Sequence, residues 1–191
     1  PPRSTLFPYT TLFRSDVKFN QDGTKMFVLG QINISVCEYT LSTGFDVSST
    51  VTFIDCKSVS PVEFAEELAF SPDGTKMFVL DNTGNDVNEF KLTTGFDIST
   101  ASYVQTFSVH TQEDTPTGLG FTYDWTKIFV TGWENDTVIE YTLSAVFNVS
   151  TASFVDTYAI ADAVTNCPSG LTFSSDASKM FILSRDCDAD R

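Results

Sequence analysis

Basic residues and histidine are scarce in this chain of 191 residues. It has 11 Lys and Arg against 25 Asp and Glu, which gives a formal net charge of -14, and it has one histidine. An acidic surface repels phosphate backbones and anionic headgroups, so we expect neither nucleic acid nor a membrane surface as a partner. Apolar runs long enough to cross a membrane are also absent, so membrane insertion is not expected.

A helical pattern of apolar residues is missing too, because apolar positions do not recur with a helical period over any useful length. Hydrophobic residues still make up 41% of the chain and aromatic residues 14%, with 18 Phe, which is too apolar for a disordered protein. Charged residues amount to only 19%, while Ser and Thr are abundant. This composition is typical of an all-β domain with polar turns and a real core.

Residues 1–15 read PPRSTLFPYTTLFRS and differ in character from the rest of the chain. The string resembles the translation of a widely used short-read sequencing adapter. We therefore expect 1–15 to be an artefact, to be set aside before reasoning about the fold. The alternative is a genuine apolar N-terminal strand. With the adapter set aside, residues 16–191 are expected to be a metagenomic fragment cut at both ends.

One sequence unit recurs along residues 16–191. The segment FNQDGTKMFVL at 19–29 returns as FSPDGTKMFVL at 70–80, and more diverged copies occupy 121–131 and 173–183. The leading residues of the copies are separated by 51, 51 and 52 positions: Phe19, Phe70, Phe121 and Phe173. Later parts of the unit repeat in the same register, with 87–92 matching 36–41 and 138–143. A fixed period of this length indicates a repeat architecture.

Each unit contains four strand signals. In the second copy they are Glu67–Phe70, Lys76–Leu80, Val87–Leu92 and Ser102–Val109. Pro72-Asp73-Gly74 marks a tight turn between the first two, and the continuously apolar second strand is typical of a strand buried on both faces. Four strands per repeat indicate a β-propeller blade. A two-sheet sandwich is the alternative, but it does not predict a repeat of about 51 residues.

The repeats predict blades at about 16–66, 67–117 and 118–169, followed by half a blade at 170–191. Closed propellers generally have four to eight blades, so we expect a partial, open propeller. The remaining blades of the same chain are then its expected partner, because the end faces would be left uncovered.

The unit resembles the YVTN-type and lactonase-like propeller repeats, which combine a Pro-Asp-Gly turn with an aromatic-Val strand and an Asn-rich loop. The matching residues are 71–79, followed by Asn85, Asp86 and Val87. The resemblance covers 16–191 and departs from the family pattern in its longer hairpin at 95–100. It implies a WD40-like propeller, often secreted or surface-associated. It carries no catalytic motif to this sequence.

Two sets of polar loop residues are candidates for a ligand surface. The first is His110 with Glu113 and Asp114, in the loop expected between blades two and three. A single histidine of this kind is either a general base or metal ligand, or simply a solvated loop residue. The second set repeats between strands of successive blades: Asn85, Asp86, Asn135 and Asp136. Turn chemistry is the competing explanation for these residues, because Asn and Asp cap turns.

Asp186, Asp188 and Asp190 alternate near the end of the sequence, as carboxylates do in some calcium loops. The Gly and distal Glu of an EF-hand loop are missing, so a solvated acidic loop is the alternative. No other cofactor is expected.

The four cysteines fall into two local pairs, Cys37 with Cys56 and Cys167 with Cys187. Folding each hairpin about its turn brings the members of a pair nearly opposite one another, and neither pair has metal-ligand spacing. Two disulfides would place the protein in an oxidising compartment, outside the cell, at its surface or in the periplasm. Free buried thiols are the alternative.

Two functions remain open from the sequence. The first is a non-enzymatic scaffold within a larger secreted or surface protein, which binds a protein or a glycan. The second is a fragment of a lactonase-like hydrolase, which would need acids, histidine or a metal on its innermost strands. We expect mostly apolar residues there, with small or polar residues between them, and this favours the scaffold: Leu68, Phe70, Leu119, Phe121, Leu171 and Phe173.

Overall fold

The structure is a computed structural model that describes residues 14–31, 33–160, 167–174, 176 and 178–184. These residues form three antiparallel sheets of four strands and one sheet of two strands. Within each sheet the strands lie side by side in chain order.

The first sheet, blade one, consists of β1 (Arg14–Phe19), β2 (Lys25–Gly30), β3 (Ser35–Leu41) and β4 (Val51–Ser58). Blade two consists of β5 (Ala65–Phe70), β6 (Lys76–Asp81), β7 (Asp86–Leu92) and β8 (Ala101–Ser108). Blade three consists of β9 (Pro116–Phe121), β10 (Lys127–Gly132), β11 (Thr137–Leu143) and β12 (Ala152–Ala159). The two-stranded sheet pairs β13 (Pro168–Phe173) with β14 (Met180–Ser184). One-turn 3-10 helices, η1 (Ile98–Thr100) and η2 (Val149–Thr151), precede β8 and β12.

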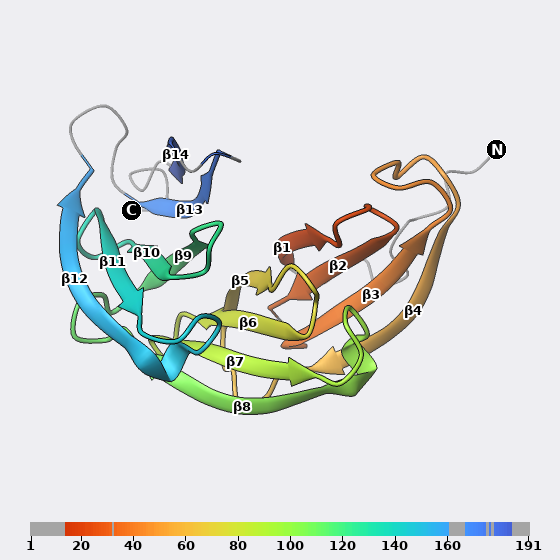
Figure 1. Ribbon diagram of the computed structural model, residues 1–191, viewed down its shortest axis with the longest axis horizontal. Coiled ribbons are helices and arrows are strands. Elements are labelled where there is room, and N and C mark those ends of the chain that lie inside the picture. Colours follow the sequence, from red (N-terminus) through yellow and green to blue (C-terminus); the bar gives the residue numbers. More distant parts are fainter. Residues whose placement is uncertain (1–13, 32, 161–166, 175, 177, 185–191) are drawn as a thin grey trace.

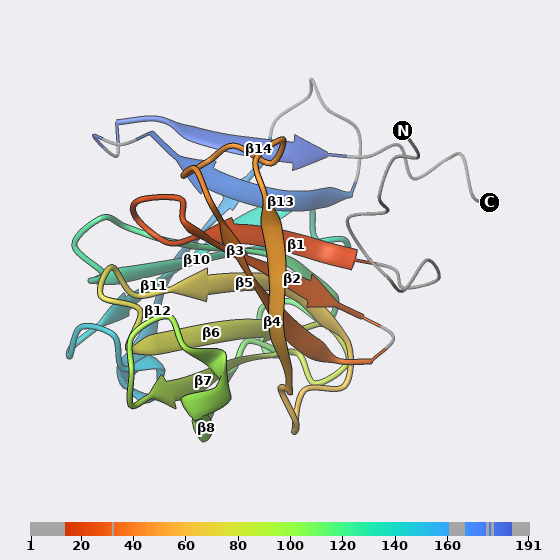
Figure 2. The same ribbon diagram turned by 90° about the vertical axis from the view of Figure 1, so that its right-hand side faces the viewer.

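The sheets are arranged in an open arc, as Figure 1 shows. The first strand of every sheet lies on the inner side of the arc, and the fourth strand of each four-stranded sheet lies on the outer side. Successive inner strands contact one another, from β1 to β5, β9 and β13. Figure 2 shows the same arrangement from the side. This confirms the predicted all-β, open propeller, and we call the space between the inner strands the axial region.

The second strand of each complete blade is apolar because both of its faces are covered. Phe27 in β2 and Phe78 in β6 have no exposed surface. One buried cluster fills the space between blades one and two, and another fills the space between blades two and three. The hydrophobic core therefore lies between the sheets, which is why these strands do not alternate between apolar and polar residues.

Within blade two, the turn between β5 and β6 packs against the hairpin between β7 and β8. Gly74 adopts a φ of +68° in the β5–β6 turn, where Asp73 accepts a hydrogen bond of 3.0 Å from the Thr75 N–H. A methyl group on Gly74 would lie 2.3 Å from the ring of Phe96, in the hairpin between β7 and β8. The turn therefore needs glycine both for its backbone conformation and for the close approach of the hairpin.

The boundary of the suspected adapter stays a prediction. β1 begins at Arg14, which pairs with Gly30 of β2, while residues 1–13 lie outside the described residues. Among the described helices, none is long and apolar enough to span a membrane.

Candidate binding site on the innermost strands

Three charged side chains from two inner strands meet in the axial region. Lys18 and Asp16 come from β1, and Glu67 comes from β5. The Lys18 Nζ lies 3.1 Å from an Asp16 carboxylate oxygen and 3.3 Å from a Glu67 carboxylate oxygen. We call these residues the axial cluster.

Each acid of the axial cluster also binds the backbone of the following blade. The Leu68 N–H donates to Asp16 over 2.9 Å, and the Leu119 N–H donates to Glu67 over 2.6 Å. Because an innermost strand is an edge strand, its outward N–H groups have no strand partner. The two carboxylates satisfy these donors and so link successive blades.

The junction after blade three is built differently. Gly118 occupies the repeat position of Asp16 and Glu67, and a methyl group there would lie 3.0 Å from the Gly170 Cα. The backbones of β9 and β13 therefore approach too closely for an acidic side chain between them. As a result, the charges of the inner strands gather on the blade-one side of the axial region.

Burial sets the protonation behaviour of the cluster. Glu67 is only 8% exposed, and this burial raises its pKa to about 7, although the charge of Lys18 works in the opposite direction. For Lys18, burial lowers the pKa, but Asp16 and Glu67 outweigh it, so the pKa is raised. Glu67 therefore changes its protonation near neutral pH, while Lys18 stays charged.

Aromatic side chains lie beside Lys18 and Glu67. A cavity of about 290 Å³ includes Lys18 and Glu67 in its lining, together with the repeat phenylalanines Phe19, Phe70, Phe121 and Phe173. Trp125 also lines it and stacks on Phe121 with ring centres 4.3 Å apart. A second cavity of about 440 Å³, between β1 and the β13–β14 sheet, shares Lys18 and Glu67. Lys18 and Glu67 thus border both cavities, whereas Asp16 lines only the second.

The expectation of mostly apolar innermost strands was incomplete. Leu68 and Leu119 are buried among the apolar side chains between blades, as the apolar pattern suggests. Asp16, Lys18 and Glu67 stand at other positions of the same strands and were missed. The available signal was their place in the repeat, three or one residues before the leading Phe.

The loop candidates of blades two and three form separate local contacts. The Asn85 side-chain amide lies 3.3 Å from Nδ1 of His110. In the orientation that turns its nitrogen toward them, this amide donates hydrogen bonds to the carbonyl oxygens of Asn82 and Asp114. His110 also contacts the Asp114 carboxylate, with both side chains well exposed. Asn85 has a φ of +54°, as its turn requires. These contacts tie one loop to its neighbour.

Glu113, from the same loop as His110, meets Asn135 of the loop between β10 and β11. Glu113 is 1% exposed and accepts hydrogen bonds from the N–H groups of Thr115 and Glu134, at 3.0 and 3.1 Å. The Asn135 amide donates to the Gln112 carbonyl over 3.0 Å and lies 3.5 Å from Glu113. A carboxylate engaged in this way holds loops together.

The two aspartates of the repeated set differ from each other. Asp86 opens β7, and burial raises its pKa. Asp136 has a φ of +48° and accepts a hydrogen bond of 3.1 Å from the Cys167 N–H. The structure therefore does not bring Asn85, Asp86, Asn135 and Asp136 into one shared ligand site.

Cys37 and Cys56 lie directly opposite each other on β3 and β4 and form a disulfide. Cys187 lies outside the described residues, so its pairing with Cys167 stays a prediction. Asp186, Asp188 and Asp190 also lie outside them, and the calcium prediction stands untested. Elsewhere, within the described part of the chain, no three His, Cys, Asp or Glu side chains are grouped as a metal site.

Comparison with known proteins supports the fold. No protein-family profile and no curated protein matches the chain. A candidate 6-phosphogluconolactonase from Bacteroides fragilis is similar, with 13% identity and a TM-score of 0.67 over 97% of this chain and 50% of that one. The periplasmic gluconolactonase of Pseudomonas aeruginosa has 16% identity and a TM-score of 0.58, over 76% and 39%. A chain of a nidogen–laminin complex has 15% identity and a TM-score of 0.59, over 90% and 56%.

These likenesses establish a β-propeller, with lactonase-like propellers among the similar folds. At such identities they carry no activity to this chain. The chain also spans only between 39% and 56% of the length of these structures.

Proposed function

We propose that the chain is a binding module of a β-propeller scaffold within a larger secreted or surface protein. Its ligand is a neutral saccharide unit of a glycan, bound at the axial cluster. The observation that carries the proposal is the meeting of Lys18 and Glu67 beside the repeat phenylalanines in one cavity, with Asp16 paired to Lys18 from outside its lining.

The chemistry of the cavity suits a sugar ring. Aromatic faces pack against the apolar C–H surface of such a ring, and a few placed polar groups fix the hydroxyls. Glu67 accepts hydrogen bonds from hydroxyls, and the Lys18 ammonium donates to ring or hydroxyl oxygens. A volume of about 290 Å³ stands near the lower end of small-molecule pockets, so we expect one sugar unit.

Charge argues for a neutral ligand over a sugar acid or a sugar phosphate. The cluster holds two carboxylates against one ammonium, and the whole chain carries a net charge of -14. Both features repel anions at the mouth of the cavity.

The Cys37–Cys56 disulfide supports the proposed location outside the cytosol, whether extracellular, on the cell surface or periplasmic. Structural disulfides persist in oxidising compartments. Glycans are also accessible there.

The proposal is tested by titrating the chain with neutral hexoses and with gluconate, using calorimetry. We expect a neutral hexose to bind and the Lys18→Met variant to weaken it at least tenfold. Lys91→Met is the matched control, because Lys91 is exposed in β7 and away from the cavity. The proposal fails if no neutral sugar saturates the protein below about 10 mM, a binding free energy of about -2.7 kcal/mol. It also fails if the two lysine variants behave alike.

A second candidate function is hydrolysis of a sugar lactone. Glu67, with its pKa raised to about 7 and its contact to Lys18, has the properties of a general acid or base at neutral pH. The test compares hydrolysis of gluconolactone above its spontaneous rate in the chain and in Glu67→Gln. A hydrolase would lose about a hundredfold or more of that rate in the variant. If the chain adds nothing to the spontaneous rate, this candidate is wrong.

A further inference from the structure

The hairpin between the third and fourth strands of a blade is held by a Lys–Glu ion pair of the preceding blade. In blade one, Lys25 and Glu38 lie 2.7 Å apart, between β2 and β3. The Lys25 Nζ donates to the Phe96 carbonyl oxygen over 2.6 Å, and the Ile98 N–H donates to Glu38 over 3.2 Å. On the hairpin, the acceptor is the Phe96 carbonyl oxygen and the donor is the Ile98 N–H, so both are backbone groups at the bend. We call such a Lys–Glu pair a hairpin-binding pair.

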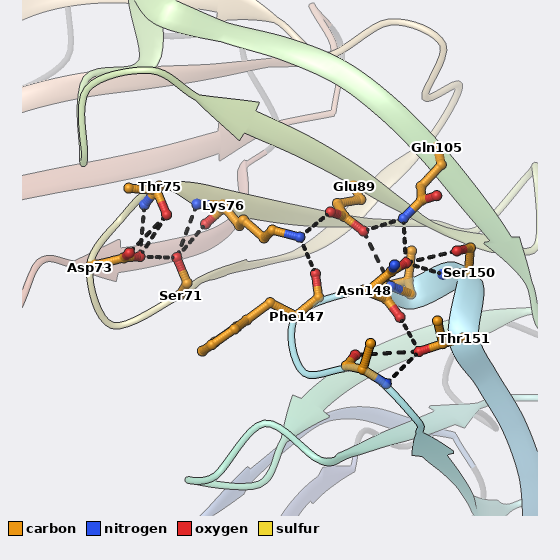
Figure 3. Close-up of polar contacts among 12 residues, drawn as sticks. Ser71, Asp73, Thr75, Lys76, Glu89, Gln105, Phe147, Asn148, Ser150 and Thr151 are labelled. Atoms are coloured by element: carbon orange, nitrogen blue, oxygen red, sulfur yellow. Dashed lines mark hydrogen bonds and ion pairs between the residues drawn. The ribbon is translucent and has the colours of Figure 1, made fainter.

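Blade two repeats this arrangement with the hairpin of blade three. Figure 3 shows Lys76 paired with Glu89 and bonded to the Phe147 carbonyl oxygen. The Val149 N–H donates to Glu89 over 3.2 Å. Gln105 adds hydrogen bonds of 2.7 Å to Glu89 and to the Asn148 side chain. The same contacts therefore recur one repeat further along the chain.

Blade three carries the third hairpin-binding pair, Lys127 and Glu140, at a separation of 2.7 Å. No described hairpin contacts it. Its side chains are 45% and 25% exposed, whereas those of Lys76 and Glu89 are 29% and 2% exposed. The third pair thus has the geometry of the other two, with its backbone partners replaced by solvent.

The aromatic contacts of the hairpin show the same difference. Phe96 lies 6.0 Å from Phe27 and 5.6 Å from Phe70 between ring centres, so three rings meet between blades one and two. The corresponding rings after blade three, Phe129 and Phe173, lie 5.0 Å apart. Among the described residues, no third ring joins them.

The β13–β14 sheet presents a strand edge beside this surface. β14 is the second strand of its sheet, and within the described residues its far edge has no partner. Phe181 and Leu183 are 54% and 68% exposed, whereas Phe78 and Leu80 at the equivalent positions of β6 are fully buried. An edge of this kind accepts an additional strand.

We propose that the β14 edge and the Lys127–Glu140 pair together bind a β-hairpin of the repeat's own type. This hairpin has the pattern of Gly95–Thr100: a glycine, an aromatic residue, Asp or Asn, and then a branched aliphatic residue. The first strand of this hairpin, which corresponds to the third strand of a blade, pairs with β14. Its aromatic ring joins Phe129 and Phe173. Its bend binds Lys127 through a carbonyl oxygen and Glu140 through an N–H. This surface is separate from the axial cavity proposed above.

The test uses a synthetic peptide with the sequence of residues 86–108, which contains β7, the hairpin and β8. Labelled peptide is titrated with the whole chain, and hydrogen exchange of the complex is measured. We expect saturable binding and slower exchange of the β14 amides. Glu140→Ala should weaken binding at least tenfold, and Glu134→Ala, an exposed acid of the same blade, should leave it within twofold.

A control peptide with Phe96→Ala should bind at least tenfold more weakly than the parent peptide, because it lacks the third ring. The proposal is overturned if the parent peptide does not saturate the chain below about 1 mM, or -4.1 kcal/mol. It is equally overturned if Glu140→Ala binds as tightly as Glu134→Ala. Protection elsewhere but not in β14 would also contradict it. Because Lys127 and Glu140 are partly exposed, Glu140→Ala is expected to fold like the parent.

Discussion

Glu89 lies at the centre of the contact between blades two and three, and replacing it with Ala should destabilise the fold strongly. Its side chain is 2% exposed and binds Lys76, the Val149 N–H and the Gln105 amide. In Glu89→Ala, the ammonium loses its counter-charge and the Val149 N–H loses its acceptor, while the Gln105 amide keeps its hydrogen bond to Asn148. Water reaches Lys76, which is 29% exposed, but not the interior of the junction.

The expected cost follows from these contacts. Removing one member of a buried ion pair typically costs 3–5 kcal/mol, and a partly exposed partner reduces this figure. Each buried donor left without an acceptor adds about 1–3 kcal/mol unless the structure relaxes. We therefore expect Glu89→Ala to lower the free energy of unfolding by about 3 kcal/mol. Glu38→Ala should cost about 2–3 kcal/mol, because Glu38 is also buried and binds Lys25 and the Ile98 N–H.

Glu140→Ala provides the internal control, since Glu140 is 25% exposed and has no described hairpin partner. Its cost should stay below about 1 kcal/mol, as for a surface ion pair. Urea denaturation of the three variants measures these values, with equal slopes required for the comparison. Equal costs for Glu89 and Glu140 would refute the reasoning, because they would show that contact with the next hairpin contributes nothing.

Three further predictions concern other junctions. Removing the disulfide in the Cys37→Ala, Cys56→Ala double variant should lower the free energy of unfolding by roughly 3 kcal/mol, because the link spans a sequence separation of 19. A urea midpoint equal to that of the oxidised parent would contradict this. Glu67 has a folded pKa of about 7, above its ordinary value of 4.5, so its protonated form stabilises the fold below pH 4.5 and this contribution is lost as the pH rises through 7. The stability of Glu67→Gln relative to the parent should therefore rise between pH 4.5 and 7.5, by on the order of 1–3 kcal/mol, and parallel stability curves would be the opposing result. Gly118→Ala should lower the free energy of unfolding by about 1–3 kcal/mol through the clash with Gly170. Gly170→Ala, with no atom near its added methyl group, should cost less in thermal denaturation. Equal losses of stability in the two variants would argue against the close approach.

The blade architecture could be predicted from the sequence because it depends on patterns that lie within each repeat. The Asp-Gly turn, the apolar second strand and the spacing of the leading Phe residues gave the strands of the second copy to within a few residues. For example, Lys76–Leu80 was expected and β6 spans Lys76–Asp81. Local turn chemistry and burial on both faces explain why this worked.

The axial cluster could not be predicted in the same way. Asp16 and Glu67 occupy one repeat position, but Gly118 and Gly170 occupy it in the later copies, so the position does not look like a site. Its importance depends on the approach of β1, β5 and β9 across the axial region, which is a long-range contact. The loop residues around His110 were easier to see in the sequence, yet their polar groups are engaged in tying loops together.

The hairpin-binding pairs were also hidden from sequence reasoning, although their residues repeat at a constant spacing. In the sequence, Lys25 and Lys76 are polar residues that begin second strands, which is common at strand ends. Glu38 and Glu89 are acids within strands that are otherwise largely apolar, and the pattern gives them no partner. Only the position of the following blade shows that each acid accepts a backbone N–H from the next hairpin.

Chemical-shift mapping with a neutral hexose is the most direct test of a saccharide site in the axial region. The account predicts that the backbone amides of Leu68, Leu119 and Leu171, beside the cavity, shift with the titration, while those of His110 and Asn135 do not. Shifts confined to the loops around His110 and Asn135 would contradict it, because they would place the ligand on the loop face and leave the axial cluster with a structural role alone.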